Sequence, residues 1–157
     1  MTSAEISLRK MSVAERHAYR DHAVEGYIAD MVGAGFLDER IARLKADRDY
    51  DHLIADPAEE WQHVTRDDVV VGSVIWAIRA DDEGAHLFIH DIEIFADYRG
   101  QGLGRLAMGA MIAKGRRKNV DAVLLNVFEN NVVARSLYRS LGFAVTNVHM
   151  RLGIVPA

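Results

Sequence analysis

The sequence predicts a mixed α/β fold of one domain, residues 1–157, in which helices flank a sheet that is mostly antiparallel with one parallel crossover. Three observations lead to this prediction. The length of 157 residues is a common size for a single domain. Strand and helix periodicities alternate along the chain, and short polar turns join the strands of its middle third as hairpins do. A strand, an amphipathic helix and a second strand then follow one another over residues 86–128, the pattern of a parallel crossover.

The first third of the chain predicts a short strand and a pair of helices. Residues 6–9 alternate between apolar and polar side chains, as a short strand does. Ser12 followed by Glu15 makes a capping box, so a helix is expected from there to about residue 32. Asp38 can cap a second helix, which runs to residue 55 and is stopped by Pro57 because proline cannot continue a helix.

The middle of the chain predicts the body of the sheet. Strand-like runs occupy residues 61–66, 69–79 and 86–96, with polar turns between them. A glycine-rich turn follows the third run and leads into a helix. The apolar face of that helix is expected to hold Leu103, Leu106, Ala107, Ala110, Met111 and the stem of Lys114. Residues 122–128, rich in valine and leucine, are expected to form the next strand.

The last part of the chain predicts one more helix and the edge of the sheet. Asn131 is expected to open the helix and Gly142 to cap its end. Apolar residues at helical spacing are Ala134, Leu137, Tyr138 and Leu141. Residues 143–152 alternate imperfectly and are expected to close the sheet with one or two short strands.

Composition excludes several classes of function. The formal net charge of −4 argues against general nucleic-acid binding, which needs an excess of Lys and Arg to neutralise phosphates. The chain has no cysteine, so it can form neither disulfides nor a cysteine-acyl intermediate. Residues 1–10 lack the pattern of a signal peptide, and no apolar run approaches the roughly 20 residues of a membrane span. A cytoplasmic protein without membrane or nucleic-acid partners is expected.

Polar residues interrupt the strand expected at residues 86–96, just before the glycine-rich turn. A central strand buried on both faces should be continuously apolar, yet His90, Asp91 and Glu93 lie within this one. Asp91 and Glu93 are two residues apart and share one face of the strand unless a bulge lies between them. The sequence therefore predicts that these carboxylates face a cleft. The alternative is a solvated edge of the sheet.

The turn at residues 98–105 has the composition of an anion site. Glycines let backbone N–H groups approach an anion closely, and the dipole of the following helix favours negative charge. Gly102, Gly104 and Ala107 also fit the dinucleotide fingerprint, with Glu129 as the ribose-binding acid. However, the chain after Glu129 is too short for the remaining strands of a doubly wound domain. A turn that merely needs positive φ angles is the plain alternative.

Two motifs together identify a family resemblance. Arg99 to Gly104 match the pattern Arg/Gln-x-x-Gly-x-Gly/Ala, and residues 131–143 match N-x-x-A-x-x-L-Y-x-x-x-G-F. On these motifs the chain resembles the GNAT superfamily of acyl-CoA-dependent N-acetyltransferases. The resemblance extends from about residue 69 to the C-terminus and implies the GNAT-like acyl-CoA N-acyltransferase fold. It also implies acetyl-CoA as the acyl donor and an amine, on a small molecule or a peptide, as the acceptor.

The resemblance also implies roles for individual residues. The coenzyme A pyrophosphate is expected on the backbone of the glycine-rich turn, and the pantetheine arm along the preceding strand. The residues expected to contact the cofactor are Ile92, Ile94, Arg99, Gly100, Gln101, Gly102, Leu103, Gly104, Arg105 and Asn131. Tyr138 is expected to be the acid that protonates the leaving thiolate, although its spacing alone favours core packing. Asp91 or Glu93 is expected to remove the proton of the acceptor ammonium. Some relatives carry glutamate where this chain has His90.

The sequence therefore predicts direct acetyl transfer to a primary amine in a ternary complex, with a backbone N–H of the strand at residues 92–94 polarising the thioester carbonyl. The alternatives are a non-catalytic acyl-CoA sensor and a dinucleotide-binding module. No metal site is expected, because His86 and His90 lack a further ligand nearby. The other histidines, including His22 and His63, form no metal-binding motif and are interpreted as ordinary surface or core residues. A monomer and a homodimer both remain compatible with the sequence.

Overall fold

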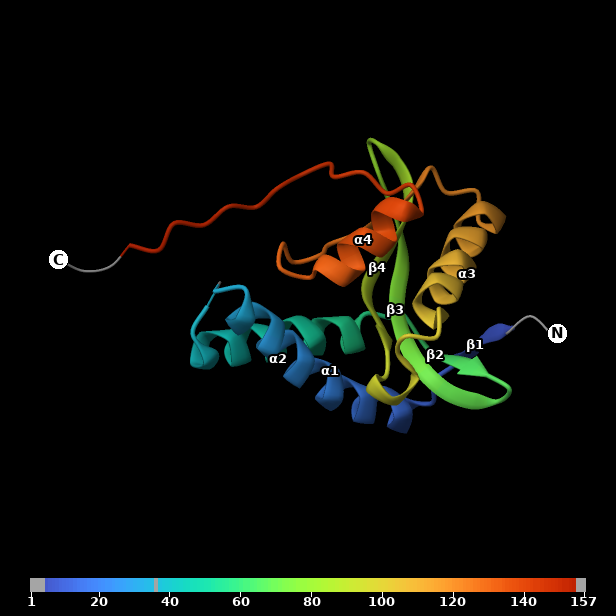
Figure 1. The fold of residues 1–157 in the computed structure, drawn as a ribbon, viewed down its shortest axis with the longest axis horizontal. Coiled ribbons are helices and arrows are strands. Elements are labelled where there is room, and N and C mark those ends of the chain that lie inside the picture. The colour runs from blue at the N-terminus through green and yellow to red at the C-terminus, as the bar shows by residue number, and fades with distance from the viewer. Residues whose placement is uncertain (1–4, 36, 155–157) are drawn as a thin grey trace.

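The computed structural model describes residues 5–35 and 37–154, and its centre is a five-stranded sheet (Figure 1). The strands are β1 (Ile6–Lys10), β2 (Glu60–Arg66), β3 (Val69–Asp81), β4 (Gly84–Ile94) and β5 (Ala122–Leu125). They lie in the order β1-β2-β3-β4-β5. The first three pairs of neighbours are antiparallel, and β4 and β5 are parallel. The predicted mixed sheet with one parallel crossover is confirmed.

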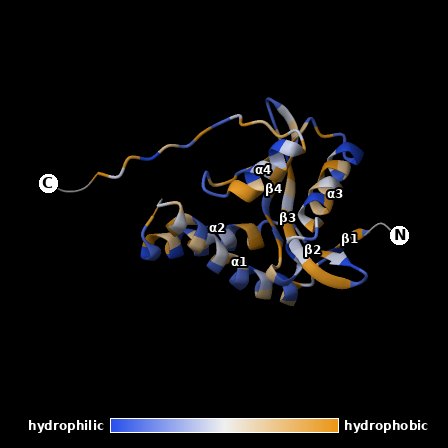
Figure 2. Ribbon diagram, in the orientation of Figure 1, coloured by the Kyte–Doolittle hydropathy of each residue, from blue (hydrophilic) through white to orange (hydrophobic). Residues whose placement is uncertain are grey.

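Helices pack on both faces of this sheet (Figure 1). They are α1 (Val13–Gly33), α2 (Glu39–Ala55), α3 (Leu103–Arg117) and α4 (Val132–Ser140). Helices α1 and α2 share a core with Trp61 and Ile75, whereas α3 and α4 pack with Trp76 and Ile89 on the opposite face. Figure 2 shows the hydrophobic colour along the central strands between these layers. Within the described residues, no helix is long and apolar enough to cross a membrane.

The helices begin where the sequence predicts. The Ser12 hydroxyl accepts from the backbone N–H of Glu15 at 3.2 Å, and the Glu15 carboxylate accepts from the backbone N–H of Ser12 at 2.7 Å. The predicted capping box is therefore confirmed. Asp38 and Asn131 likewise cap α2 and α4 with their side chains. The capped start of α1 fixes which of its side chains face the sheet.

Some predicted strand and helix ends are wrong by a few residues. Strand β4 ends at Ile94 rather than at residue 96, because a short 3-10 helix, η1 (Ala96–Tyr98), begins the turn. Strand β5 ends at Leu125 rather than at residue 128, because its pairing with β4 stops where β4 bulges. Helix α4 ends one residue before its C-cap Leu141, and Gly142 follows with φ +97°, a conformation that favours glycine.

The strands expected at residues 143–152 are not formed. The backbone from residue 143 to 154 has no regular secondary structure, and in Figure 1 the segment leaves the body of the molecule in an extended path. Alternation of apolar residues suggested a strand, but a strand also requires a hydrogen-bonded neighbour. Among the residues that the structure describes, this segment has none.

Candidate active site

A β-bulge at His90 shapes the middle of β4. The strand pairs with β3 through Ile89 and then through Asp91, so His90 is an extra residue. Because an extra residue breaks the alternation, His90 and Asp91 both point toward the side of α1 and α2. His90 Nε2 lies 3.0 Å from Oε1 of Glu59, whereas Asp91 contacts Tyr19 of α1. The bulge therefore separates His90 from the two carboxylates that follow it.

Asp91 and Glu93 lie on the same face of β4, as expected, and meet at α1. The hydroxyl of Tyr19 donates to Oδ2 of Asp91 and lies 3.5 Å from Oε2 of Glu93. His22 Nε2 is 2.9 Å from that same Glu93 oxygen, and Arg99 Nη2 is 3.5 Å from the other. We call Asp91 and Glu93 the acid pair. The bulge lies before Asp91, not within the acid pair, so their shared orientation is preserved.

The two members of the acid pair differ in their surroundings. Burial raises the pKa of Asp91 from its usual 3.8 to about 6; the hydrogen bond from Tyr19 opposes this rise and the negative charge of Glu93 adds to it. Burial and the charge of Asp91 raise the pKa of Tyr19, so its hydroxyl remains a neutral donor. A carboxylate that titrates near the working pH is better suited to accept a proton than an ordinary one. Asp91 has this property.

Asp91→Asn is expected to make the fold more stable above pH 6. The native state holds the Asp91 proton more tightly than the unfolded chain, so the unfolding free energy of the wild type falls as pH rises from about 4 to about 6. Asparagine removes this loss, which amounts to about 2 to 3 kcal/mol at about 1.4 kcal/mol per pKa unit. Thermal melts at pH 4.5 and 7.5 measure the difference in stability, and the variant should melt higher than the wild type only at pH 7.5.

The control for this experiment is Asp68→Asn. Asp68 is exposed in the β2–β3 turn at φ +63°, a conformation that asparagine also tolerates. This variant should follow the wild type at both pH values. If Asp91→Asn also melts at the wild-type temperature at both pH values, Asp91 does not have a raised pKa.

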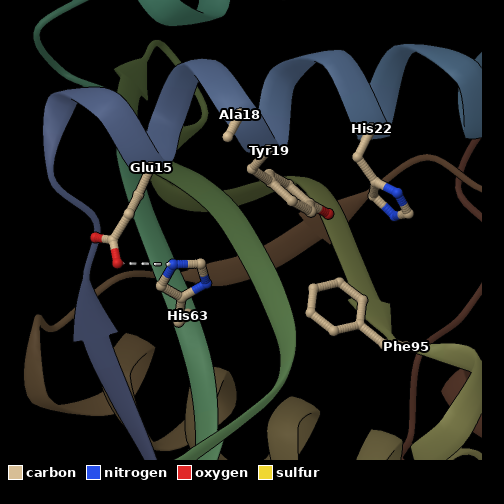
Figure 3. A pocket seen from close by; sticks show the side chains of 6 residues that line it. All are labelled: Glu15, Ala18, Tyr19, His22, His63 and Phe95. Carbon is tan, nitrogen blue, oxygen red and sulfur yellow. Dashed lines mark ion pairs between the residues drawn. The ribbon is translucent and has the colours of Figure 1, made fainter.

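A cavity of about 330 Å³ lies between α1 and the sheet, and Figure 3 shows the side chains that line it. Its lining residues are Glu15, Ala18, Tyr19, His22, His63 and Phe95. Tyr19 and His22 connect it to the acid pair, since their polar atoms contact Asp91 and Glu93. At the other end, His63 Nε2 lies 3.6 Å from a carboxylate oxygen of Glu15. Aromatic rings and carboxylates together suit a ligand that carries both a cation and an apolar part.

Most of this lining was missed by sequence reasoning. The sequence patterns identify Glu15 only as part of a helix cap, and His22 and His63 only as ordinary surface or core residues. The available signal was spacing, because Glu15, Tyr19 and His22 recur at intervals of four and three residues and so share one face of α1. Which face of α1 lies over β4, however, is known only from the fold.

The glycine-rich turn lies at the N-terminus of α3. Gly100 and Gly102 both have φ +75°, and apart from the adjacent residues of the chain, no atom of the described residues lies within 4 Å of where a Cβ would stand at either position. Gly102 is the N-cap of α3, and the first helical bond runs from the N–H of Leu106 to the carbonyl of Gly102. The backbone N–H groups of residues 103–105 thus precede the helical hydrogen bonds. Open space above glycines at a helix N-terminus fits a phosphate group.

Three side chains connect this turn to the rest of the structure. The Nε of Arg99 donates to the carbonyl of Ile94 at 2.9 Å, which fixes the exit from β4. Gln101 accepts a hydrogen bond from Arg66 at 3.1 Å. Arg105 donates to the hydroxyl of Ser140, so the start of α3 is bound to the end of α4.

Ile92 and Ile94 lie on the face of β4 opposite to the acid pair. Both pack with Leu103 and Ala107 of α3. Their strand carries carboxylates toward α1 and apolar side chains toward α3, as alternation requires beyond the bulge. The residues expected to line the pantetheine arm and those expected to handle the proton therefore occupy two sides of the same strand segment.

Tyr138 packs in the same hydrophobic cluster as Ile92, whereas the side chain of Asn131 caps α4. Tyr138 is half-buried, its ring lies 5.7 Å from that of Phe143, and it packs with Leu137 and Leu141. Burial and the charge of Asp91 raise the pKa of Tyr138 above its usual value, so the hydroxyl stays protonated. The side chain of Asn131 accepts from the N–H of Ala134 at 3.2 Å. Its contact with a cofactor remains a prediction.

No group of three or more histidine, aspartate or glutamate side chains within residues 5–35 and 37–154 is arranged to hold a metal ion.

Comparison with known proteins identifies the family and the fold of the chain. Residues 19–143 match the acetyltransferase (GNAT) family. The chain is 26% identical over 151 residues to the uncharacterized N-acetyltransferase YdgE of Bacillus subtilis, a match that covers 92% of this chain and 96% of YdgE. The crystal structure of YycN from Bacillus subtilis superposes on this chain with a TM-score of 0.88 at 24% sequence identity. The superposition covers 97% of this chain and 100% of YycN.

The aminoglycoside N-acetyltransferase AAC(6')-Iy, solved in complex with CoA, has the same fold. Its TM-score is 0.61 at 18% identity, with 97% of this chain and 96% of that chain covered. The family match spans the acid pair, the glycine-rich turn and Tyr138. This protein belongs to the acetyltransferase (GNAT) family.

Proposed function

We propose that this protein transfers an acetyl group from acetyl-CoA to a primary amine by direct attack in a ternary complex. One observation carries the proposal: on one face of β4, the carboxylates of Asp91 and Glu93 contact Tyr19 and His22, which line a cavity, and on the other face apolar side chains pack beside the glycine-rich turn. Two substrates can therefore reach one strand from opposite faces. Holding both reactants in place supplies much of the rate enhancement in such a transfer.

The donor side consists of the glycine-rich turn and the part of β4 beyond the bulge, where β5 no longer pairs with it. The N–H groups at the start of α3 would bind the pyrophosphate, and Ile92 and Ile94 would contact the pantetheine arm. Acetyl-CoA supplies an activated thioester. Strand β5 pairs with β4 as far as Ile89, so the backbone N–H groups of β4 beyond the bulge that point away from β3 are not used by β5 and can polarise a carbonyl. The CoA complex of AAC(6')-Iy, which shares the fold, supports this assignment of the donor.

The acceptor side is the cavity next to the acid pair. An amine is protonated near neutral pH and must lose a proton before it attacks. Asp91 is the candidate to take that proton, because it contacts Tyr19 of the cavity wall and its pKa is raised by burial to about 6. Glu93, in contact with His22 at the cavity wall, is placed to attract the ammonium. The acceptor is therefore a cationic amine with an apolar part.

An acetylation screen tests this function. Purified protein and acetyl-CoA are incubated with an aminoglycoside, a polyamine, a lysine peptide and a peptide with a free N-terminus, and free thiol is measured. Release that depends on one of these amines supports the proposal. Binding of acetyl-CoA without turnover of any amine indicates a sensor module instead.

Acetyl-CoA is expected to raise the melting temperature of the wild type but not that of Gly102→Val. At about 100 times Kd, binding adds about 2.7 kcal/mol, and each kcal/mol is worth about 2 to 4 °C in a domain of this size. A valine side chain would occupy the space above Gly102 and abolish this shift. Because Gly102 has φ +75°, valine also strains the backbone, and the unliganded protein should melt a few degrees lower.

Gly109→Val is the matched control. Gly109 lies within α3, and a Cβ there would also meet no described atom within 4 Å, but its φ is helical. This variant should keep the acetyl-CoA shift. Equal shifts in both variants, or protection of the wild type by NAD instead of acetyl-CoA, would rule out the glycine-rich turn as the donor site.

A further inference from the structure

Helix α1 carries a glycine on the face that meets the acid pair. Gly26 lies in the interior of the helix, where glycine destabilises the helix relative to alanine. It follows His22 by four residues and Tyr19 by seven, the spacings at which helical residues share a face. The side chains of Tyr19 and His22 contact Asp91 and Glu93. Residue 26 therefore lies on the side of α1 that is turned toward the acid pair.

Space is open at Gly26, although the same face of α1 is covered before and after it. Apart from the adjacent residues and the nearby backbone of its own helix, no described atom lies within 4 Å of where a Cβ of Gly26 would stand. One turn earlier, the ring of His22 lies 5.7 Å from that of Phe95. Two turns later, about 10 Å along the helix, a Cβ at Gly33 would lie 3.8 Å from Nδ2 of Asn130. We call the open space between these contacts the gap at Gly26.

The side chains around the gap at Gly26 are predominantly acidic. Asp30 follows Gly26 by one helical turn, and desolvation and the charge of Glu93 raise the pKa of Asp30 above its usual value. The acid pair contacts the same helix one to two turns before Gly26. Arg99 balances part of this charge, because its Nη2 lies 3.5 Å from Oε1 of Glu93. A cleft lined mainly by one sign of charge attracts ligands of the opposite sign, here a cation.

We propose that the acceptor amine reaches the acid pair through the gap at Gly26, so that the size of residue 26 determines which acceptors the protein takes. This inference rests on the proposed function, which requires a cationic amine beside Asp91. It explains why the interior of α1 holds a residue that weakens the helix, because a larger side chain would occupy the path of the ligand. The cavity lined by Tyr19 and His22 begins one turn earlier, so the apolar part of the acceptor can lie in it.

Gly26→Leu is expected to lower kcat/KM for the best acceptor of the screen by about tenfold or more, mainly through KM, because its side chain hinders binding. Gly26→Ala should have a smaller effect on kcat/KM and should melt about 2 to 4 °C above the wild type, since alanine favours the helix. Neither variant should change the shift in melting temperature that acetyl-CoA produces. A glycine with a purely structural role would not combine a loss of acceptor use with a gain of stability.

Gly109→Leu and Gly109→Ala are the matched controls. Gly109 is likewise an exposed glycine inside a helix, and apart from the adjacent residues and its own helix, no described atom lies within 4 Å of its Cβ position. Both controls should keep the wild-type kcat/KM, and Gly109→Ala should gain stability as Gly26→Ala does. A wild-type KM for the acceptor in Gly26→Leu would contradict the proposal.

Thiol labelling tests the gap without acetyl transfer, so its result is separate from that of the proposed function. The chain has no cysteine, and Gly26→Cys places a single thiol at the gap. Relative to free cysteine at low salt, the cationic reagent aminoethyl methanethiosulfonate should react with this thiol about tenfold faster than the anionic sulfonatoethyl methanethiosulfonate. Adding Asp30→Asn to the same chain should reduce this preference, because it removes one of the negative charges.

The four amines of the acetylation screen then serve as competitors of the labelling reaction. The amine that the protein acetylates should slow the labelling of Gly26→Cys and leave that of Gly109→Cys unchanged. If no amine is acetylated, protection of Gly26→Cys by any of the four still supports the path, whereas the proposed function fails. Equal rates with the two reagents, together with no protection by any amine, would overturn the proposal.

Discussion

Asp91→Asn is expected to lower kcat/KM near neutral pH by about 100-fold or more, since removal of a general base costs about 10² to 10⁴ in rate. The asparagine keeps the shape of the side chain and can still accept from Tyr19, but it cannot take a proton. In the wild type, kcat/KM should rise with pH to a plateau, with an apparent pKa of about 6 that reflects Asp91. The variant should lack this inflection and recover partly at high pH, where the free amine is more abundant. The measurement is thiol release over pH 5–9 with the best acceptor of the screen.

Glu93→Gln distinguishes the two carboxylates of the acid pair. Glu93 contacts His22 at the cavity wall, so its loss should weaken acceptor binding and raise KM more than it lowers kcat. The opposite result, with a large fall in kcat for Glu93→Gln and near-normal activity for Asp91→Asn, would identify Glu93 as the base. Asp91→Asn is also expected to melt higher than the wild type at pH 7.5. Together, loss of activity and gain of stability would show that the buried charge serves function at the expense of the fold.

Local signals in the sequence predicted much of the fold. Capping residues such as Ser12, Asp38 and Asn131 act within their own helix turn, so their effect can be worked out without the tertiary structure. Alternation and helical spacing gave the class of each element from β1 to α4. The Asp67-Asp68 turn, with both φ angles positive, joins β2 and β3 where the polar pair stands.

The candidate site was only partly predictable. The polar interruption of β4 pointed to Asp91 and Glu93, and the glycines pointed to the start of α3. The bulge at His90 was not visible, because it arises from pairing between β3 and β4 rather than from the residue itself. The contact of Tyr19 and His22 with the acid pair likewise depends on how α1 crosses the sheet, which is set by packing of distant segments.

Residues 143–152 show the limit of periodicity in a different way. Their alternation is compatible with a strand, but strand pairing is a property of two segments, and no strand of the described residues pairs with them. The predicted strands are wrong.

Tyr138→Phe is expected to lower kcat by about 100-fold while leaving the fold intact. Removing the hydroxyl removes the proton donor for the departing thiolate, whereas the ring keeps its packing against Phe143 and Leu141. Because an alkyl thiol has a pKa of about 8.5, the thiolate leaves tolerably well unaided, and general-acid help is worth the lower part of the 10² to 10⁴ range. The raised pKa of Tyr138 keeps its hydroxyl protonated throughout the working pH range. Single-turnover thiol release at saturating acetyl-CoA measures the effect.

Three further measurements separate this role from simple packing. The affinity for acetyl-CoA should be unchanged in Tyr138→Phe, since a proton donor acts in the transition state rather than in the ground state. The difference from the wild type should narrow when a donor with a more acidic thiol replaces acetyl-CoA, because such a thiolate needs no proton to leave. The control is Tyr27→Phe. Tyr27 lies on α1, and its hydroxyl donates to Asp49 of α2 at 3.5 Å, so removing this hydroxyl should leave full activity. If Tyr138→Phe instead melts several degrees lower and turns over at the wild-type rate, Tyr138 is a core residue and the leaving group departs without its help.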